Sequence, residues 1–244
     1  MKPVIGVPLR YQHLEDGRPI LYLGERVRRA LQKAGAIVHT ITPVLDVDFI
    51  DTKRSEFPEL TEADKKVIDY NLSLCDGVFF PGGKKFTPYD RYLLECCIDK
   101  KIPVLGVCLG MQLMSCYNEE VHLEKNETLI NHKQENDLEF THKVRINSNS
   151  KLFEIIGKEE ILVNSFHNYH VTENSTYKTV AYSEDGLIEA IEFPSKTFNL
   201  GVQWHPEISY DFDDDSKKII DYFIKETIIN RKNKQIDQNI SINN

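Results

Sequence analysis

The first half of the chain alternates short apolar segments with segments of helical periodicity. Apolar runs rich in β-branched residues, typical of buried strands, occupy residues 3–9, 36–42, 77–80 and 103–107. Apolar residues at helical spacing fall between and after these runs, within residues 27–34, 61–72, 87–98 and 111–114. Strands that are apolar throughout, rather than alternating, indicate a parallel sheet with helices on both faces.

The second half has a different pattern, in which short polar stretches join strand-like segments and some antiparallel pairing is expected. These segments are residues 128–131, 142–146, 161–164, 178–182, 187–193 and 199–204. A last amphipathic helix is expected roughly from Asp214 to Ile229. Residues 230–244 are rich in Asn and Gln and are expected to form a disordered tail, which leaves one domain over residues 1–229.

Charge and composition exclude several classes of protein. The 30 Lys and Arg against 38 Asp and Glu give a net charge of -8, with no basic stripe, which argues against binding to nucleic acid. No apolar run approaches the roughly 20 residues that span a bilayer, and the first residues do not resemble a signal peptide, so a cytoplasmic protein is expected.

Five cysteines without a C-x-x-C pair favour neither disulfides nor zinc. The acidic run at residues 211–215 is compatible with a metal site, but acids at a helix start are more common.

The most informative segment is residues 104–112, where Cys108 stands between Gly106 and Gly110 at the junction of a buried strand and a helix. This spacing is that of a G-x-S-x-G nucleophile elbow with sulfur in place of oxygen. The N–H of Leu109 then points at the group that the sulfur attacks, and the positive end of the helix favours a thiolate. The alternative is a structural cysteine buried between packing glycines.

A second segment, residues 201–207, ends a strand with His205 and Glu207. Pro206 favours an extended conformation at His205, which allows the carboxylate to orient the imidazole as a base. The alternative is a surface pair, which is less probable beside a cysteine elbow.

A third segment, residues 79–83, places Gly82 and Gly83 at the end of a strand, where a bare N–H can act as a second oxyanion donor. The alternative is a simple turn, and the spacing of a phosphate-binding P-loop is absent. Lys84 and Lys85 follow directly, either as solvated charges or as groups that attract an anionic leaving group.

Four motifs together resemble the class I glutamine amidotransferase superfamily: G-V-C-L-G-M-Q at 106–112, P-G-G at 81–83, N-S-F-H at 164–167 and V-Q-W-H-P-E at 202–207. Within it the chain resembles the γ-glutamyl hydrolase branch, peptidase C26, which includes γ-glutamyl-γ-aminobutyrate hydrolases. The resemblance covers roughly residues 3–225. It implies a flavodoxin-like α/β fold with a mainly parallel central sheet and a set of site residues. These are a Cys108–His205–Glu207 triad, an oxyanion hole at Gly83 and Leu109, and substrate-binding residues Gly82, Gln112, Ser165, Phe166 and His167.

Three departures from the family's usual pattern concern the pocket. Lys84 and Lys85 replace the segment that ends in an acid after the two glycines, Asn168 and Tyr169 replace His-Gln, and residues 116–119 replace G-G-T-L. These departures do not change the predicted catalytic residues, but they leave the identity of the substrate open.

The sequence therefore predicts a hydrolase of small γ-glutamyl amides that forms a glutamyl-thioester and needs no cofactor or metal. One alternative is a glutaminase subunit that supplies ammonia to a partner synthetase, and another is a non-catalytic binding module. A homodimer is compatible with either enzyme. His167, His170 and His205 can also be read as a three-histidine metal site, but the triad already explains His205.

Overall fold

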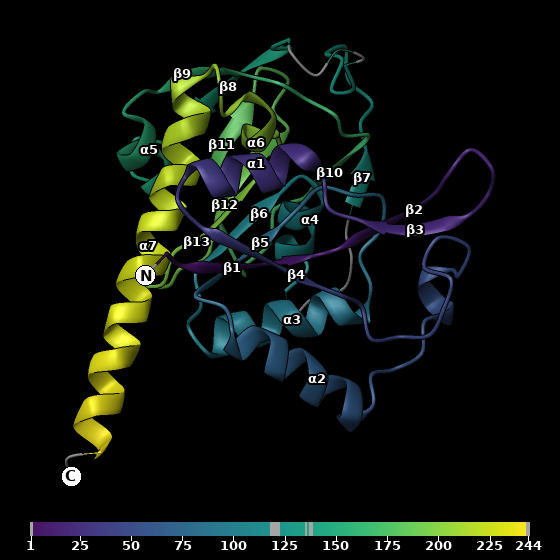
Figure 1. Cartoon of the computed structure of the whole chain (residues 1–244). Helices are drawn as coiled ribbons and strands as arrows, with labels where there is room; N and C mark the ends of the chain where they lie inside the picture. Colours follow the sequence, from purple (N-terminus) through teal and green to yellow (C-terminus); the bar gives the residue numbers. More distant parts are fainter. Residues whose placement is uncertain (1, 118–122, 135, 137–138, 243–244) are drawn as a thin grey trace.

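The centre of the molecule is a nine-stranded mixed sheet with the strand order β4-β1-β5-β6-β13-β12-β11-β8-β9 (Figure 1). The computed structural model describes residues 2–117, 123–134, 136 and 139–242. Five strands are parallel: β4 (Ile37–Ile41), β1 (Val4–Pro8), β5 (Gly77–Phe80), β6 (Val104–Val107) and β13 (Asn199–Val202). The remaining four are antiparallel to their neighbours: β12 (Ile188–Glu192), β11 (Lys178–Ser183), β8 (His142–Ile146) and β9 (Glu160–Val163). The predicted α/β fold is confirmed.

Helices cover both faces of this sheet, and each face has its own apolar core (Figure 1). One face carries α1 (Glu25–Lys33), α5 (Lys151–Ile156) and α7 (Asp214–Ile242), with the short α6 (Pro206–Ser209) against α1 and α7. The other face carries α2 (Glu62–Ser73), α3 (Pro88–Asp99) and α4 (Leu109–Ser115). Burial on both sides explains why the parallel strands are apolar throughout.

The starts of α2 and α3 follow from local sequence signals. Thr61 and Asp64 form a capping box at α2, and Thr87 and Asp90 form another at α3. Each box satisfies backbone N–H groups that have no partner within the helix, so the helix begins where the sequence predicts.

Several short elements lie outside the sequence predictions. Strands β2 (Arg10–His13) and β3 (Pro19–Tyr22) form a hairpin, and β7 (Leu123–Lys125) pairs with β10 (Tyr169–Val171). The strand predicted at residues 128–131 is wrong, because this segment is irregular and Leu129 is fully exposed. The polar segment 46–60 is a loop, as predicted, with one 3-10 turn at Arg54–Glu56. Part of the family departure at residues 116–119 lies outside the described residues.

Helix α7 continues to Ile242 rather than ending near Ile229. Neither Gly nor Pro occurs between these positions, so nothing in the sequence stops the helix. The division into a domain over residues 1–229 and a disordered tail stays a prediction. Among the described residues, no helix is both long and apolar enough to cross a membrane.

Candidate active site

Three adjacent parallel strands carry the predicted site to one edge of the sheet. Strands β5, β6 and β13 lie side by side, with Phe80 paired to Gly106 and Gly106 paired to Gly201. Since the carboxyl ends of parallel strands meet at the same edge, the segments that follow them come together. These segments contain Gly82, Cys108 and His205.

Cys108 occupies a strained turn between β6 and α4. Its φ of 52° and ψ of -105° are rare for a residue with a side chain, and its N–H donates to the carbonyl of Val202 at 2.8 Å. A Cβ on Gly106 would lie 2.7 Å from the carbonyl carbon of Gly110, and a Cβ on Gly110 would collide with the carbonyl oxygen of Phe80. The close chain crossing therefore requires both glycines, as the predicted elbow demands.

His205 is held from its side chain and from its backbone. Its Nδ1 lies 2.7 Å from Oε1 of Glu207. The amide of Asn164 accepts from the His205 N–H at 2.8 Å and donates to the His205 carbonyl at 2.9 Å. Pro206 begins α6, so Glu207 reaches the imidazole from the first helical turn rather than from an extended chain. The predicted pairing is present, with a different local backbone.

The surroundings of His205 favour its cationic form. Burial lowers the pKa of the imidazole, but the Glu207 charge and then the hydrogen-bonded Cys108 outweigh burial and raise that pKa to about 10. An imidazolium beside a sulfur atom stabilises a thiolate and carries a proton for a leaving group.

We expect the His205 ring to titrate near pH 10 when its Cε1–H signal is followed by NMR. Replacing Glu207 with Gln removes a negative charge that favours the cation, so the titration should move to lower pH, toward the ordinary value of 6.5. A midpoint near 6.5 in the unmodified protein would contradict this assignment. His39, which is hydrogen-bonded to Asn71, serves as the reference ring in both samples.

A cavity of about 370 Å³ opens at this edge and is lined by Cys108, His205, Glu207, Gly82 and Phe166, among others. Gly82 lies against the first two groups, since a Cβ there would lie 2.7 Å from Cε1 of His205 and 3.6 Å from Cβ of Cys108. The Phe166 ring meets the His205 ring edge-on, with centroids 5.5 Å apart. The side chains of the predicted triad and one wall of the predicted pocket thus line the same cavity.

The two predicted oxyanion donors are neighbours. Leu109 is the first residue of α4, so its N–H has no acceptor within the helix. A Cβ on Gly83 would lie 3.0 Å from Cδ2 of Leu109, and Gly83 lines the cavity that contains Cys108. The oxyanion role of both residues stays a prediction.

The other predicted substrate-binding residues divide into two groups. Gln112 lines a second cavity of about 460 Å³ and donates to the carbonyl of Tyr169 at 3.0 Å. Ser165 is almost fully buried and donates to the carbonyl of His132 at 2.8 Å. His167 is buried, with Nδ1 3.0 Å from the Tyr169 carbonyl, so its side chain contacts a backbone group. The side chains of Ser165 and His167 therefore bind backbone groups in the wall of the pocket. Gln112 lines the second cavity, and Phe166 lines the cavity that contains Cys108.

The two lysines after the glycines have different surroundings. Lys85 donates to the carbonyls of Ile50 and Thr52 at 3.0 and 2.5 Å and so holds the loop 46–60. Lys84 is exposed and lines the second cavity together with Arg54. Lys84 is therefore a solvated charge at the opening of the second cavity, whereas the ammonium group of Lys85 is bound to the loop.

The acidic run at residues 211–215 is used in ion pairs and hydrogen bonds. Asp211 pairs with Lys33 at 2.5 Å and Asp215 with Lys158 at 2.6 Å, while Asp213 accepts from a backbone N–H at the start of α7. These contacts agree with the helix-start interpretation of the acids.

Two supporting groups lie outside the predicted site. Arg10 and Asp90 form a buried ion pair of 2.7 Å, and Arg10 also donates to the carbonyl of Pro81 at 3.0 Å, directly before the paired glycines. Asn164 clamps the His205 backbone, as described above. Asn164 belongs to the N-S-F-H motif, which was a usable signal, whereas nothing in the sequence around Arg10 indicates its partner.

Comparison with known proteins identifies the family of the chain. The family model described as Peptidase C26 matches residues 88–207. The putative glutamine amidotransferase-like protein YvdE of Lactococcus lactis is 31% identical over 183 residues, which are 64% of this chain and 76% of that protein. The chain belongs to the glutamine amidotransferase-like peptidase C26 family.

Two further similarities extend over more of the chain. The gamma-glutamyl-gamma-aminobutyrate hydrolase PuuD of Escherichia coli is 24% identical over 235 residues, covering 84% of this chain and 85% of that protein. A putative GMP synthase subunit from Thermoplasma acidophilum has a TM-score of 0.66 at 14% identity, covering 96% of this chain and 99% of that chain. The predicted family resemblance is confirmed. The family match and the similarity to PuuD support an enzyme of the glutamine-amide hydrolase or amidotransferase type, and the GMP synthase subunit shows the same fold.

Proposed function

We propose that this member of the family hydrolyses the γ-glutamyl amide bond of a small γ-glutamyl compound. The observation that carries the proposal is one cavity lined by the strained Cys108, by the His205–Glu207 pair and by Gly83, next to the first N–H of α4. A nucleophile, an oriented acid–base group and two backbone donors are the parts that acyl transfer needs. The similarity to PuuD over most of both chains supports a γ-glutamyl substrate.

The reaction proceeds through a covalent intermediate. The Cys108 thiolate attacks the γ-carbonyl carbon, and the N–H groups of Gly83 and Leu109 hold the negative oxygen that forms. The His205 imidazolium gives its proton to the departing amine, which leaves a glutamyl-thioester on sulfur. Neutral His205 then takes a proton from water, hydroxide attacks the thioester, and glutamate leaves. Glu207 keeps the ring oriented and stabilises its cation throughout.

Binding of the glutamyl end is assigned to Gln112 and Phe166, on either side of the elbow. The second cavity lies against Leu109 and Gln112 and carries the cations Lys84 and Arg54. Positive charge at this opening favours an amine that bears a carboxylate or a phosphate. Lys85 also lines this cavity, but its ammonium group is bound to two carbonyls of the loop 46–60.

Replacing Lys84 with Ala should raise KM for substrates with acidic or phosphorylated amines by about 2- to 5-fold, the scale of an exposed charge interaction. The kcat values and the KM of neutral amides should stay the same, because Lys84 does not touch the reacting atoms. Lys66→Ala, on the exposed side of α2, is the matched control. An equal rise in KM for neutral and acidic amines would contradict a role in leaving-group recognition.

A panel of γ-glutamyl amides tests the proposed reaction. Neutral, acidic and phosphorylated amines, together with glutamine, are incubated with the purified chain, and released glutamate is measured. The proposal expects rapid hydrolysis of at least one amide class and slow use of glutamine. Release of glutamate from none of these compounds would overturn it.

A second function, glutaminase activity in support of a partner synthetase, is favoured by one observation. The fold matches nearly the whole of a protein described as a putative GMP synthase subunit. This function predicts that glutamine is the preferred substrate and that its hydrolysis is slow until the partner binds. Rapid hydrolysis of other γ-glutamyl amides by the isolated chain, with little use of glutamine, would exclude it.

A further inference from the structure

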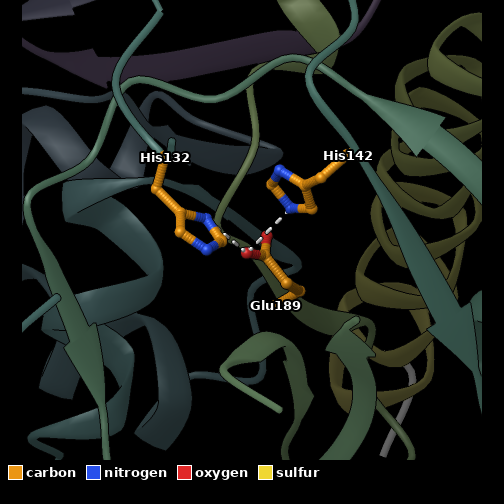
Figure 2. Close-up of side chains that lie close together, drawn as sticks. All are labelled: His132, His142 and Glu189. Atoms are coloured by element: carbon orange, nitrogen blue, oxygen red, sulfur yellow. Dashed lines mark hydrogen bonds and ion pairs between the residues drawn. The ribbon is translucent and has the colours of Figure 1, made fainter. Parts of the chain in front are cut away.

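Three histidine side chains surround one carboxylate in the interior of the antiparallel half of the sheet. The carboxylate is Glu189 on β12, which is fully buried, and the imidazoles belong to His132, to His142 on β8 and to His167, each 3% exposed. Figure 2 shows the rings of His132 and His142 directed at the Glu189 carboxylate. The proposed catalytic reaction uses none of these four groups, so the cluster calls for a separate explanation.

The distances from the Glu189 carboxylate to the three imidazoles are close to those between adjacent ligands of a tetrahedral metal ion. Glu189 Oε1 lies 3.5 Å from His132 Nδ1, 3.2 Å from His142 Nε2 and 3.5 Å from His167 Nε2. In a tetrahedral site with metal–ligand bonds of about 2.0–2.1 Å, neighbouring ligand atoms are about 3.3–3.4 Å apart. The ligand atoms of His132, His142 and Glu189 also lie within 4.8 Å of one another, so a single ion reaches all three.

The outer nitrogen of His132 has an acceptor that fixes the tautomer of this ring. His132 Nε2 lies 2.9 Å from Asp185 Oδ2, whereas His167 Nδ1 lies near both the Tyr169 carbonyl and the Asn126 amide nitrogen, at 3.0 and 3.2 Å. A ring proton held by Asp185 leaves an electron pair on His132 Nδ1, which is the arrangement that supports a metal-bound histidine. An electron pair that faces a carboxylate oxygen repels it unless a positive charge lies between them.

The inner atoms are otherwise unsatisfied. Within the described part of the chain, His132 Nδ1, His167 Nε2 and Glu189 Oε2 are buried and have no hydrogen-bond partner. Buried polar atoms are almost always paired, because an unpaired one costs roughly 1–3 kcal/mol. Several such atoms around one point indicate that a ligand which pairs with all of them belongs there.

The charges of the cluster indicate which ion fits. Glu189 and Asp185 contribute two negative charges and neutral imidazoles contribute none, so a divalent cation balances the set. Imidazole nitrogens together with a single carboxylate are typical of Zn²⁺ rather than of Mg²⁺ or Ca²⁺, which prefer oxygen ligands. We propose that His132, His142 and Glu189 form a buried zinc site, with Asp185 orienting His132 and with His167 beside it.

This site would stabilise the wall of the active-site cavity without taking part in the reaction. The carbonyl of His132 accepts from the Ser165 hydroxyl and from the His167 N–H, both at 2.8 Å. Phe166 lies between these two residues, pairs with Lys133 in an isolated bridge and lines the cavity next to His205. An ion bound to His132, His142 and Glu189 thus ties this support to β8 and β12.

The first test measures metal in the protein itself. The full chain, without a histidine tag, is produced in medium containing zinc, dialysed and analysed for metals, and one zinc per chain is expected. After removal of the zinc by a chelator, added Co²⁺ should give the visible absorption of tetrahedral coordination, and added Zn²⁺ should raise Tm. Metal-free protein, together with no Co²⁺ absorption and no change in Tm, would overturn the proposal.

Variants then locate the bound ion. Asp185→Asn should weaken zinc binding by about 10- to 100-fold, the usual effect of losing a partner of a ligand, and Glu189→Gln should weaken it further. His39→Gln, a partly buried histidine bound to Asn71 outside the cluster, is the matched control and should bind zinc like the unmodified chain. Unchanged zinc affinity in both Asp185→Asn and Glu189→Gln would place the ion elsewhere and overturn the site. If Glu189→Gln does not fold, the zinc affinity of Asp185→Asn and the Co²⁺ spectrum of the unmodified chain decide whether the ion binds at this site.

Discussion

Replacing Cys108 with alanine is expected to lower kcat/KM for γ-glutamyl amides by at least about 10⁴-fold. The thiolate is the only group in the proposed reaction that bonds to the substrate carbon, so its loss removes the thioester route. Substrate binding should persist, because Gly82, Phe166 and Gln112 remain in place. Glutamate release and ligand-binding titration on the same variant separate the two effects.

Cys116→Ala is the matched control for this variant. Cys116 lies at the opposite end of α4, is 2% exposed and is also a free thiol. Its replacement costs some packing energy but leaves the elbow intact, so kcat/KM should not change. Retention of more than about 1% of the activity by Cys108→Ala would contradict nucleophilic catalysis at this position.

Replacing Asp90 with alanine should lower the free energy of unfolding by about 3–5 kcal/mol, because it leaves the Arg10 guanidinium buried without its counter-charge. Asp90 also accepts from the N–H and hydroxyl of Thr87, so the start of α3 loses its capping box. Urea unfolding measures the change. Activity should fall as well, since Arg10 holds the Pro81 carbonyl directly before the paired glycines.

An exposed ion pair in the same hairpin region provides the control. Asp16 and Arg18 lie 2.8 Å apart with side chains 52% and 74% exposed, so Asp16→Ala should cost no more than about 1 kcal/mol. Similar losses of stability for Asp16→Ala and Asp90→Ala would contradict the importance assigned to the buried pair.

The parallel half of the fold was predictable because its signals are local. The strand at residues 77–80 is wholly apolar, and capping residues mark the starts of α2 and α3. The β2–β3 hairpin lacked such a signal, because its first strand is polar and its order depends on distant contacts. Tyr11 stacks on Phe49 of the loop 46–60 with ring centroids 4.7 Å apart, a contact that local periodicity cannot reveal.

The candidate site likewise contains residues that local motifs predicted and residues that only the folded chain reveals. Cys108, His205 and Glu207 stand in short motifs at strand ends, so their meeting follows from the parallel pairing of two adjacent strands, β6 and β13. Arg10 and Asp90 are 80 residues apart, and the capping box that contains Asp90 does not indicate Arg10, so their pairing appears only in the folded chain. The histidine cluster depends likewise on contacts between the antiparallel strands and two loops. His167 was identified from its motif, but its surroundings depend on His132 and Glu189, which the sequence left unmarked.

The central claim, that Cys108 is the nucleophile of a glutamyl-transfer site, is tested most directly by covalent trapping. A glutamine-like diazoketone is incubated with the purified chain, so that a carbon–sulfur bond forms and dinitrogen leaves, and the products are mapped by mass spectrometry of peptides. We predict one adduct per chain, located on Cys108 and absent from Cys108→Ala. No adduct, or an adduct shared among Cys75, Cys96, Cys97 and Cys116, would contradict the claim.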